Sequence, residues 1–345
     1  MESTTSFQLA SKTTLSLGPK FVLPEDKRPN LLQVSILDSV PIIDMNQEPS
    51  SLVRNISRAC EDYGFFQIIN HGVPYELQDR MLSTLAEFFE LPPEEKAQFF
   101  TTDINTKQVR LYNDYLKVDG QEKVGMWSES FLHPCHRLDD IMNLLPENPP
   151  QYREVIAEYS KAIHVLMKRL LSLISMGLGL EKDSLEKSLG AEKHILNAHA
   201  NYYPPCPDPE LTLGLPAHTD IGGLTVLLQP EGLTSLQVLK DGEWLAIHPI
   251  PNAFVINLAD QTQVLSNGRY KSVLHRAVTN RSQRRVSLAI FCSPDPHTII
   301  SPIEDLIDEE HPRIYHSYRF AEFLQEFKRQ EGTTRMVKEC FQLTL

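Results

Sequence analysis

The sequence of 345 residues predicts a mainly β protein with flanking helices. From residue 195 to about 292, short β-branched and apolar runs alternate with turn residues, which is typical of an antiparallel sandwich or barrel. Before residue 195, two stretches repeat their apolar residues at spacings of three and four, as amphipathic helices do. With 41% hydrophobic and 23% charged residues, the chain has the composition of a protein that buries a large core.

The N-terminal part of the sequence predicts a flexible leader followed by two short strands. Residues 1–20 are rich in Ser and Thr, but they contain no arginine and no apolar segment of the kind found in signal peptides. We therefore expect residues 1–37 to form a flexible leader. Apolar runs at 40–44 and 65–69 predict the first two strands, and an Asn-His-Gly turn ends the second.

Two amphipathic helices are expected next. One begins after Pro74 and ends at the Leu-Pro-Pro sequence 91–93, and the other spans about 151–174 and ends before two glycines. The stretch 101–148 between them shows no clear periodicity. Because long irregular segments in compact proteins often cover binding sites, we expect residues 101–148 to form a lid.

The second half of the chain contains the strand-like runs. These runs are 195–203, 224–228, 235–239, 244–248, 253–258, 273–279 and 286–292. A last amphipathic helix follows at about 317–329. The expected organisation is a leader at 1–37, an N-terminal α/β region at 38–194, a β domain at 195–310 and a C-terminal helix and tail at 311–345.

Charge and composition exclude several kinds of partner. Asp plus Glu outnumber Lys plus Arg by 45 to 33, and no basic patch opposes the net charge of -12, so we expect no nucleic acid partner. The longest apolar stretch, 170–180, is shorter than the roughly 20 residues of a membrane-spanning helix, so we expect no membrane partner. The five separated cysteines form neither a disulfide framework nor a metal knuckle, which favours a cytoplasmic protein. We expect a monomer that acts on a small molecule.

Three residues, His218, Asp220 and His275, predict a metal site. Side chains two residues apart in an extended strand point to the same face, so His218 and Asp220 can bind one ion together while His275 approaches from another strand. Two imidazoles and one carboxylate leave the opposite coordination positions open, which suits non-haem ferrous iron. A His-x-Asp pair also arises by chance, and each residue is then an ordinary surface or core residue.

A carboxylate receptor is predicted ten residues after His275. Arg285 and Ser287 share one face of the next strand, and a guanidinium beside a hydroxyl binds a carboxylate well. A buried arginine without an anionic partner is destabilising. Arg285 therefore needs either a ligand or an internal Asp or Glu, and the residues alone leave both alternatives open.

These residues belong to a longer pattern that resembles the plant branch of the 2-oxoglutarate- and iron(II)-dependent dioxygenases. The matching segments are VPIID at 40–44, GFFQIINHG at 64–72, NYYPPCP at 201–207, HTD at 218–220, HR at 275–276 and RVS at 285–287. One departure is Ala259-Asp260, where that family commonly has Gly-Asp. The resemblance covers about residues 40–327 and implies a double-stranded β-helix, a jelly-roll core, with helices packed outside.

The resemblance also implies the site residues and cofactors. Its catalytic iron ligands would be His218, Asp220 and His275. The 2-oxoglutarate positions would be Arg285, Ser287, Tyr203 and Asn201. The positions that line the organic-substrate pocket in relatives correspond to Phe291, His199, Ser130 and Leu132. The implied cofactors are Fe(II), 2-oxoglutarate and O2, with ascorbate as an activator.

The implied function is the hydroxylation, desaturation or ring closure of a small plant specialised metabolite. The chain is similar to salicylate hydroxylases, flavone and flavonol synthases and hyoscyamine hydroxylase, so we expect a phenolic, flavonoid or phenylpropanoid substrate, with an alkaloid as the alternative. Two further classes stay open at this point. One is a relative that uses iron and oxygen without 2-oxoglutarate, and the other is a zinc-dependent or non-catalytic jelly-roll protein.

Overall fold

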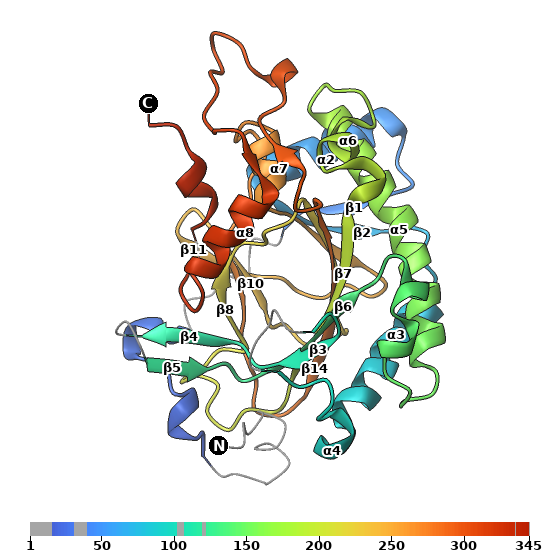
Figure 1. The fold of residues 1–345 in the computed structure, drawn as a ribbon, viewed down its shortest axis with the longest axis vertical. Coiled ribbons are helices and arrows are strands. Elements are labelled where there is room, and N and C mark those ends of the chain that lie inside the picture. Colours follow the sequence, from blue (N-terminus) through green and yellow to red (C-terminus); the bar gives the residue numbers. More distant parts are fainter. Residues whose placement is uncertain (1–15, 31–39, 102–106, 119–121, 335, 345) are drawn as a thin grey trace.

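The computed structural model describes residues 16–30, 40–101, 107–118, 122–334 and 336–344. In these ranges the chain forms two main β-sheets that face each other, with helices packed on the outside (Figure 1). A search of the same ranges finds no helix with the length and apolar character needed to cross a membrane.

The larger sheet has eight strands in the order β1-β2-β12-β9-β14-β7-β6-β3. Its strands are β1 (Ile42–Asp44), β2 (Phe65–Ile69), β3 (Arg110–Tyr112), β6 (Glu129–Pro134), β7 (Ile195–Tyr203), β9 (Leu224–Leu228), β12 (Phe254–Leu258) and β14 (Arg285–Ser293). Neighbouring strands are antiparallel except β1 and β2, which run parallel. The N-terminal strands therefore extend the same sheet that the β-rich half of the chain builds.

The smaller sheet has four antiparallel strands in the order β11-β10-β13-β8. Its strands are β8 (Leu215–His218), β10 (Leu236–Lys240), β11 (Glu243–Ala246) and β13 (His275–Ala277). Two further pairs stand apart, β4 (Tyr115–Val118) with β5 (Glu122–Gly125) and β15 (Ile299–Ile300) with β16 (Tyr318–Arg319). The sequence predicts no helix inside the β-rich half, but the short helix α7 (Asp260–Leu265) lies between β12 and β13.

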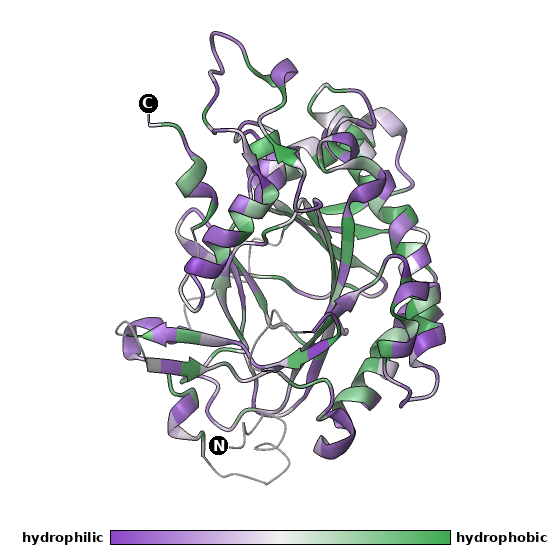
Figure 2. Cartoon of the chain, in the orientation of Figure 1, coloured by the Kyte–Doolittle hydropathy of each residue, from purple (hydrophilic) through white to green (hydrophobic). Residues whose placement is uncertain are grey.

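Helices cover the outer face of the larger sheet. The three long ones are α2 (Pro49–Asp62), α3 (Tyr75–Glu90) and α5 (Tyr152–Gly177). The start of α3 directly after Pro74 confirms the helix predicted there. Hydrophobic and hydrophilic residues alternate along α5 (Figure 2), as expected for a helix with one face on a core. The shorter helices are α4 (Pro93–Lys96), α6 (Ser184–Ser188) and α8 (Phe320–Arg329).

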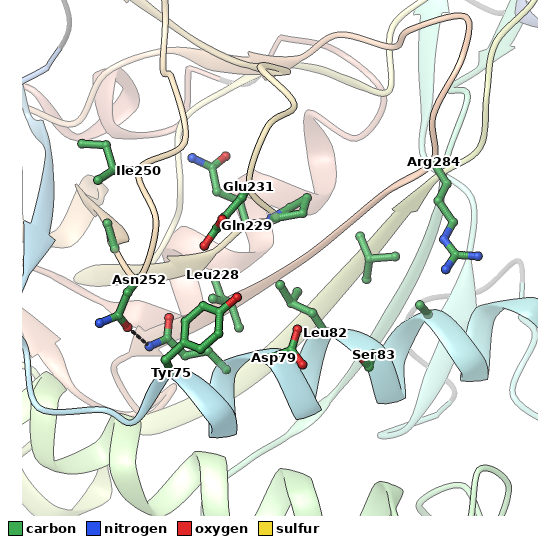
Figure 3. A pocket seen from close by; sticks show the side chains of 15 residues that line it. Tyr75, Asp79, Leu82, Ser83, Leu228, Gln229, Glu231, Ile250, Asn252 and Arg284 are labelled. Carbon is green, nitrogen blue, oxygen red and sulfur yellow. Dashed lines mark hydrogen bonds between the residues drawn. The ribbon is translucent and has the colours of Figure 1, made fainter.

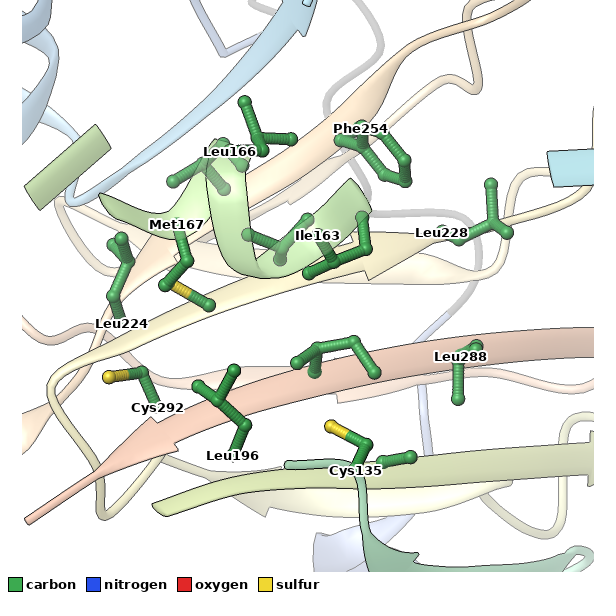
Figure 4. Close-up of a cluster of buried hydrophobic side chains, with 14 of the residues drawn as sticks. Cys135, Ile163, Leu166, Met167, Leu196, Leu224, Leu228, Phe254, Leu288 and Cys292 are labelled. Carbon is green, nitrogen blue, oxygen red and sulfur yellow. The ribbon is translucent and has the colours of Figure 1, made fainter. Parts of the chain in front are cut away.

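The centre of the core lies between α5 and the larger sheet. Ile163, Leu166 and Met167 of α5 lie over Leu224 of β9 and Leu288 of β14 (Figure 4), and each of the five is at most 3% exposed. Burying an apolar side chain of this size contributes about 1.5–3 kcal/mol. This packing holds β9 and β14 in place, so their opposite face can carry polar residues at fixed positions.

Successive residues of β7 and β14 point alternately toward the helices and toward the space between the two sheets. The residues on the helix side, all part of the apolar core, are Leu196, Ala198, Ala200, Tyr202, Val286, Leu288, Ile290 and Cys292. The residues between them face the other way, toward the smaller sheet. The polar positions of these two strands are thus gathered on the inner face of the barrel.

The expectation of a flexible leader is wrong for residues 16–30. Leu17 and Phe21 are buried beside Trp127, and the ring centroids of Phe21 and Trp127 are 5.0 Å apart. The backbone N–H of Leu23 also donates to the carbonyl of Leu211 at 2.9 Å. A few isolated apolar residues anchor this segment without any periodic pattern. The rest of the predicted leader lies outside the described residues.

The expectation that residues 101–148 are irregular is also wrong. The segment contains β3, β4, β5 and β6, and β6 pairs with β7 along its whole length, from Glu129 opposite Tyr202 to Pro134 opposite Asn197. Short strands of three to six residues carry too little periodicity to be seen in the sequence. Because β3 and β6 complete the larger sheet, the expected boundary at residue 195 does not separate two sheets.

Candidate functional site

The three predicted metal-binding residues meet at one end of the smaller sheet. His218 is the last residue of β8, and it lies directly opposite His275, the first residue of β13. One possible ligand atom from each of His218, Asp220 and His275 lies within 4.8 Å of the others. The prediction that His218 and Asp220 share a strand is wrong for Asp220, which follows β8. The backbone carbonyl of Asp220 accepts a hydrogen bond from the N–H of Asp260 at 2.8 Å and does not bond to a neighbouring strand of the smaller sheet.

Backbone carbonyls orient both imidazoles. His218 Nδ1 donates to the carbonyl of Pro216 at 2.8 Å, and His275 Nδ1 donates to that of Val273 at 3.2 Å. A carbonyl only accepts, so Nδ1 carries the proton in each ring and Nε2 keeps its lone pair. Both Nε2 atoms lie 3.6 Å from Oδ1 of Asp220. Hydrogen bonds of this kind commonly fix the orientation of metal-binding histidines.

The carboxylate of Asp220 is hydrogen-bonded through one oxygen. Its Oδ2 accepts from Thr225 Oγ1 at 2.6 Å and from Asn257 Nδ2 at 2.5 Å, while Oδ1 faces the two Nε2 atoms. Burial alone would raise the pKa of Asp220, but His275, His218 and these two hydrogen bonds outweigh burial and lower it. The side chain is therefore an ionised carboxylate with Oδ1 directed at the possible metal position.

The chemistry of this donor set suits ferrous iron. Burial, followed by the neighbouring His275, lowers the pKa of His218 to about 4, so its imidazole is a neutral ligand at physiological pH. Two imidazoles and one carboxylate on one side of an ion leave the other side open for a cosubstrate and oxygen. Hydrolytic zinc sites use similar ligands, so the donor set alone does not identify the metal.

A second buried carboxylate, that of Asp260, holds the loop that follows β8. Its Oδ2 accepts from Thr219 Oγ1 at 3.2 Å, and its Oδ1 accepts from Ser272 Oγ at 2.7 Å and pairs with Lys338 Nζ at 3.2 Å. Lys338 is itself only 5% exposed. The preceding Ala259 has φ -109°, which any residue adopts, so the departure from Gly-Asp introduces no backbone strain.

Arg285 lies on the inner face of the larger sheet and is 2% exposed. Its two Nη atoms donate to Ser287 Oγ at 3.0 Å and to Gln229 Oε1 at 3.1 Å, and its Cζ lies 5.1 Å from the ring centroid of Tyr203. In the described part of the chain, Arg285 Nε and Gln229 Nε2 are buried without hydrogen-bond partners, and no Asp or Glu pairs with Arg285. Of the two partners that the sequence allowed for Arg285, an internal Asp or Glu is therefore not found among the described residues. The other partner, a ligand with a carboxylate, fits this receptor.

The other two predicted cosubstrate residues lie beside this receptor. Tyr203 of β7 is directly opposite Arg285, and Asn201 is directly opposite Ser287. Burial raises the pKa of Tyr203, so its phenol stays protonated and able to donate. Ser130 of β6 is fully buried, and its hydroxyl donates to Oδ1 of Asn201 at 2.8 Å. The predicted substrate residue Ser130 thus also positions the amide of Asn201.

The remaining predicted residues, His199, Phe291 and Leu132, form an aromatic end of the same inner face. The ring centroids of His199 and Phe291 are 5.7 Å apart, and Leu132 is directly opposite His199. His199 Nε2 lies 2.9 Å from the hydroxyl of Tyr112. Burial lowers the pKa of His199 to about 4, so its ring is neutral. All the predicted site residues therefore lie on the inner faces of the two sheets or, for Asp220, in the adjoining loop.

Several residues of the site escaped the sequence analysis. Thr225 and Asn257 bind Asp220, and Gln229 binds Arg285. One signal was available, because Asn257 is the polar residue in the otherwise apolar strand β12. Thr225 and Gln229 carry no such signal, since a threonine is common in strands and Gln229 simply follows β9.

A separate groove of about 320 Å³ lies outside the barrel, between α3 and the chain segments that follow β9 and precede β12 (Figure 3). Tyr75 and Asp79 of α3, together with Glu231 and Asn252, line it. Gln229 also lines it, so the groove lies behind the Arg285 receptor. It contains none of the three clustered residues that could hold a metal.

The fold and the site together define a class of protein. A two-sheet barrel with two histidines and a carboxylate on one side, and a buried arginine without an acidic partner on the other, is the arrangement of a non-haem iron enzyme whose cosubstrate has a carboxylate.

Comparison with known proteins gives the family. The 2OG-Fe(II) oxygenase superfamily matches residues 195–294, and the family described as "non-haem dioxygenase in morphine synthesis N-terminal" matches residues 40–152. The chain belongs to the 2-oxoglutarate- and Fe(II)-dependent oxygenase superfamily, in its plant branch. The predicted enzyme class, a dioxygenase that uses Fe(II) and 2-oxoglutarate, is confirmed.

Individual relatives cover almost the whole chain. Protein DOWNY MILDEW RESISTANCE 6 of Arabidopsis thaliana is 42% identical over 317 residues, which are 90% of this chain and 91% of that protein. Hyoscyamine 6-dioxygenase of Hyoscyamus niger is 39% identical over 322 residues, with 90% and 91% covered. The crystal structure of JOX2 in complex with 2OG, Fe, and JA matches with a TM-score of 0.88 and 34% identity, covering 99% of this chain and 98% of that chain. This match confirms the predicted jelly-roll core with flanking helices.

Proposed function

We propose that this enzyme oxidises a small phenolic, flavonoid or phenylpropanoid metabolite. When Fe(II) and 2-oxoglutarate are bound, the family's chemistry uses dioxygen to oxidise the organic substrate while 2-oxoglutarate becomes succinate and carbon dioxide. The observation that supports an aromatic substrate is the group of rings on the inner face, where Phe291, His199 and Tyr112 follow one another. Offset and edge-to-face contacts with such rings favour a planar aromatic ligand.

The proposed roles of the residues follow from their positions. His218, Asp220 and His275 bind the iron through Nε2, Oδ1 and Nε2. Arg285, Ser287 and Tyr203 bind the distal carboxylate of 2-oxoglutarate, and Asn201 contacts the same molecule. Phe291, His199, Leu132 and Ser130 line the organic-substrate pocket, with Ser130 acting also through Asn201. Ascorbate as an activator is part of the same proposal.

The segment 101–148 keeps its proposed role at the organic-substrate pocket, although it is built from strands. Arg110 and Tyr112 of β3, and Ser130 and Leu132 of β6, lie on the face that His199 and Asn201 occupy. Sequence changes in this segment would therefore alter the substrate side of the barrel and leave the iron side unchanged.

An alkaloid is the second candidate substrate, supported by the 39% identity to hyoscyamine 6-dioxygenase. Alkaloids with a basic amine are cations at neutral pH, and the half-buried guanidinium of Arg110 on the same face would repel them. We therefore rank an alkaloid below a phenolic substrate.

An anaerobic binding screen tests the proposed substrate class. The enzyme is loaded with Fe(II) and 2-oxoglutarate under nitrogen, and phenolic, flavonoid, lignan and alkaloid compounds are added one at a time. We expect members of the phenolic classes to change the visible absorption of the iron complex and to give oxidised product and succinate once air is admitted. Productive binding by alkaloids alone would overturn the proposal.

We also propose that the enzyme is a cytoplasmic monomer. Four of its five cysteines are buried and all five are unpaired, which is typical of a reducing compartment. Sedimentation of the purified chain tests the monomeric state, and a dimer would contradict it.

A further inference from the structure

Arg110 lies on the edge strand β3 and points into the barrel. Its neighbour Leu111 is 2% exposed and belongs to the apolar core on the helix side of the sheet, so Arg110 and Tyr112 point to the opposite, inner face. The register places Arg110 opposite Leu132, and Leu132 opposite His199. Arg110 is therefore in the same row as two residues of the proposed organic-substrate pocket.

The guanidinium of Arg110 has no acidic partner in the described part of the chain. Its Nη1 donates to the carbonyl of Lys107 at 3.0 Å, while its Nε is shielded from solvent and has no hydrogen-bond partner. Burial lowers the pKa of Arg110 without any carboxylate to offset that loss. Arg276 also lacks an acid, but its guanidinium stacks 4.0 Å from the ring of Trp244 and its Nε donates to Gln237. The described contacts of Arg110 include no comparable arrangement.

Neutral rings lie beside Arg110. Tyr112, two residues along, is hydrogen-bonded to His199, and the low pKa of His199 keeps that ring uncharged. The carboxylate of Asp114 lies beside Ser130 and Asn201, with its Oδ2 3.1 Å from the Ser130 hydroxyl oxygen. A positive charge that lies beside neutral rings and one aliphatic side chain, with the carboxylate of Asp114 next to Ser130, has the character of a receptor for an anion.

We infer that Arg110, beside the Tyr112–His199 pair, binds a carboxylate of the organic substrate, so that the substrate is a small organic acid oxidised at a carbon remote from its acid group. This inference rests on the proposed function and narrows its substrate class. Two strand spacings of about 4.8 Å place the backbone of Arg110 about 10 Å across the sheet from that of His199. The ring or chain of the substrate then extends past Phe291 and His199 toward the three metal-binding residues.

Matched acid and ester pairs test the inference. Binding of benzoic, cinnamic, indole-3-acetic and jasmonic acids, and of their methyl esters, is measured by calorimetry. The protein carries Mn(II) in place of iron, so that nothing turns over. Saturating 2-oxoglutarate keeps the Arg285 receptor filled, so that the added acids do not bind there. We expect at least one acid to bind about 10- to 100-fold more tightly than its ester, as charge-assisted hydrogen bonds predict.

Variants assign the preference to a residue. Arg110→Gln should remove the preference for acid over ester, Arg110→Lys should keep part of it, and Tyr112→Phe should lower it less than Arg110→Gln. Arg54→Gln serves as a control, because Arg54 is exposed on α2 and bonds only serine hydroxyls there. Affinity for 2-oxoglutarate should be unchanged in all four variants, which also shows that they are folded.

The experiment distinguishes a failure of the proposed function from a failure of the Arg110 assignment alone. If 2-oxoglutarate does not bind the wild-type protein, the proposed function itself fails. If 2-oxoglutarate binds normally but no acid binds better than its ester, or Arg110→Gln keeps the preference, then only the assignment of Arg110 is overturned.

Discussion

The two sides of the barrel interior differ in how their polar atoms are bonded. On the iron side, formed by His218, Asp220 and His275, each group that does not face the metal position already has a protein partner. On the proposed substrate side, formed by Arg110, His199 and Phe291, the Nε of Arg110 has no partner among the described residues. The iron side is thus completed by the chain itself, whereas the proposed substrate side keeps a donor that a ligand could bind.

This difference fits the roles proposed for the two sides. The iron side performs the same step whatever the organic substrate, so a preorganised geometry is favourable there. The proposed substrate side must discriminate between molecules, and a group without a protein partner suits that task because its bond forms only when the right molecule is present. The following predictions test this contrast, from the largest expected effect to the smallest.

The iron side should not tolerate the loss of a ligand. In His275→Ala or Asp220→Ala, metal binding and turnover should fall by more than about 100-fold, beyond the effect of losing an outer hydrogen bond. The fold should persist, because both side chains lie at the end of the smaller sheet and add little to the apolar core. Metal content and circular dichroism measure the two effects, and His297→Ala, an exposed histidine, is the control. Normal activity in His275→Ala would refute the iron assignment.

The receptor for 2-oxoglutarate should be sensitive to shape as well as charge. Arg285→Lys keeps the positive charge but loses the planar pair of donors, so affinity for 2-oxoglutarate should fall by about 10- to 100-fold, or about 1.5–3 kcal/mol. The matched control is Arg284→Lys, since Arg284 is exposed and pairs with Glu90. An unchanged Michaelis constant for 2-oxoglutarate in Arg285→Lys would assign Arg285 a structural role.

Replacing a residue that only positions a metal-binding side chain should lower metal affinity less than replacing the metal-binding residue itself. Thr225→Val removes the hydroxyl that donates to Asp220 at 2.6 Å while keeping the side-chain volume. Affinity for Mn(II) should fall by about tenfold, because the carboxylate loses part of its orientation. Thr234→Val, which removes a hydroxyl bonded to His248 away from the metal site, should leave Mn(II) affinity unchanged. Equal affinities in the two variants would show that Thr225 does not position Asp220.

Substitutions on the proposed substrate side should change how much organic product forms, while 2-oxoglutarate is still consumed. In Phe291→Ala and Leu132→Ala we expect the yield of oxidised product per succinate to fall by about tenfold or less, because a badly placed substrate still allows 2-oxoglutarate to be consumed. Leu144→Ala, at a side chain that is 47% exposed, is the control. Product and succinate are measured together. If both fall in step with affinity for 2-oxoglutarate, these positions support the barrel and do not contact the substrate.

The sequence predicted the iron side better than the substrate side, for a physical reason. Strands β7 and β9 were predicted to the residue, because alternation and turn residues mark both of their ends. The iron-side residues were recognised from their spacing and from the HTD and HR segments of the family pattern, since His218 lies in β8, a strand that the sequence analysis did not predict. Arg110 lies in a strand of three residues whose pairing with β6 leaves no periodic signal. Its position on the inner face could only be learned from the three-dimensional structure.

The link between Asp260 and Lys338 has a consequence for the order in which the protein matures. Every strand of both sheets precedes Lys338 in the chain, so a ribosome releases the whole barrel before it adds the cation that meets Asp260. Until then a buried carboxylate beside the iron loop lacks its counter-ion, which is destabilising. We expect a chain that stops after residue 334 to form its sheets but to take up metal poorly, which titration with Mn(II) would measure. Metal loading would then follow synthesis of the C-terminal segment, so that incomplete chains do not acquire iron.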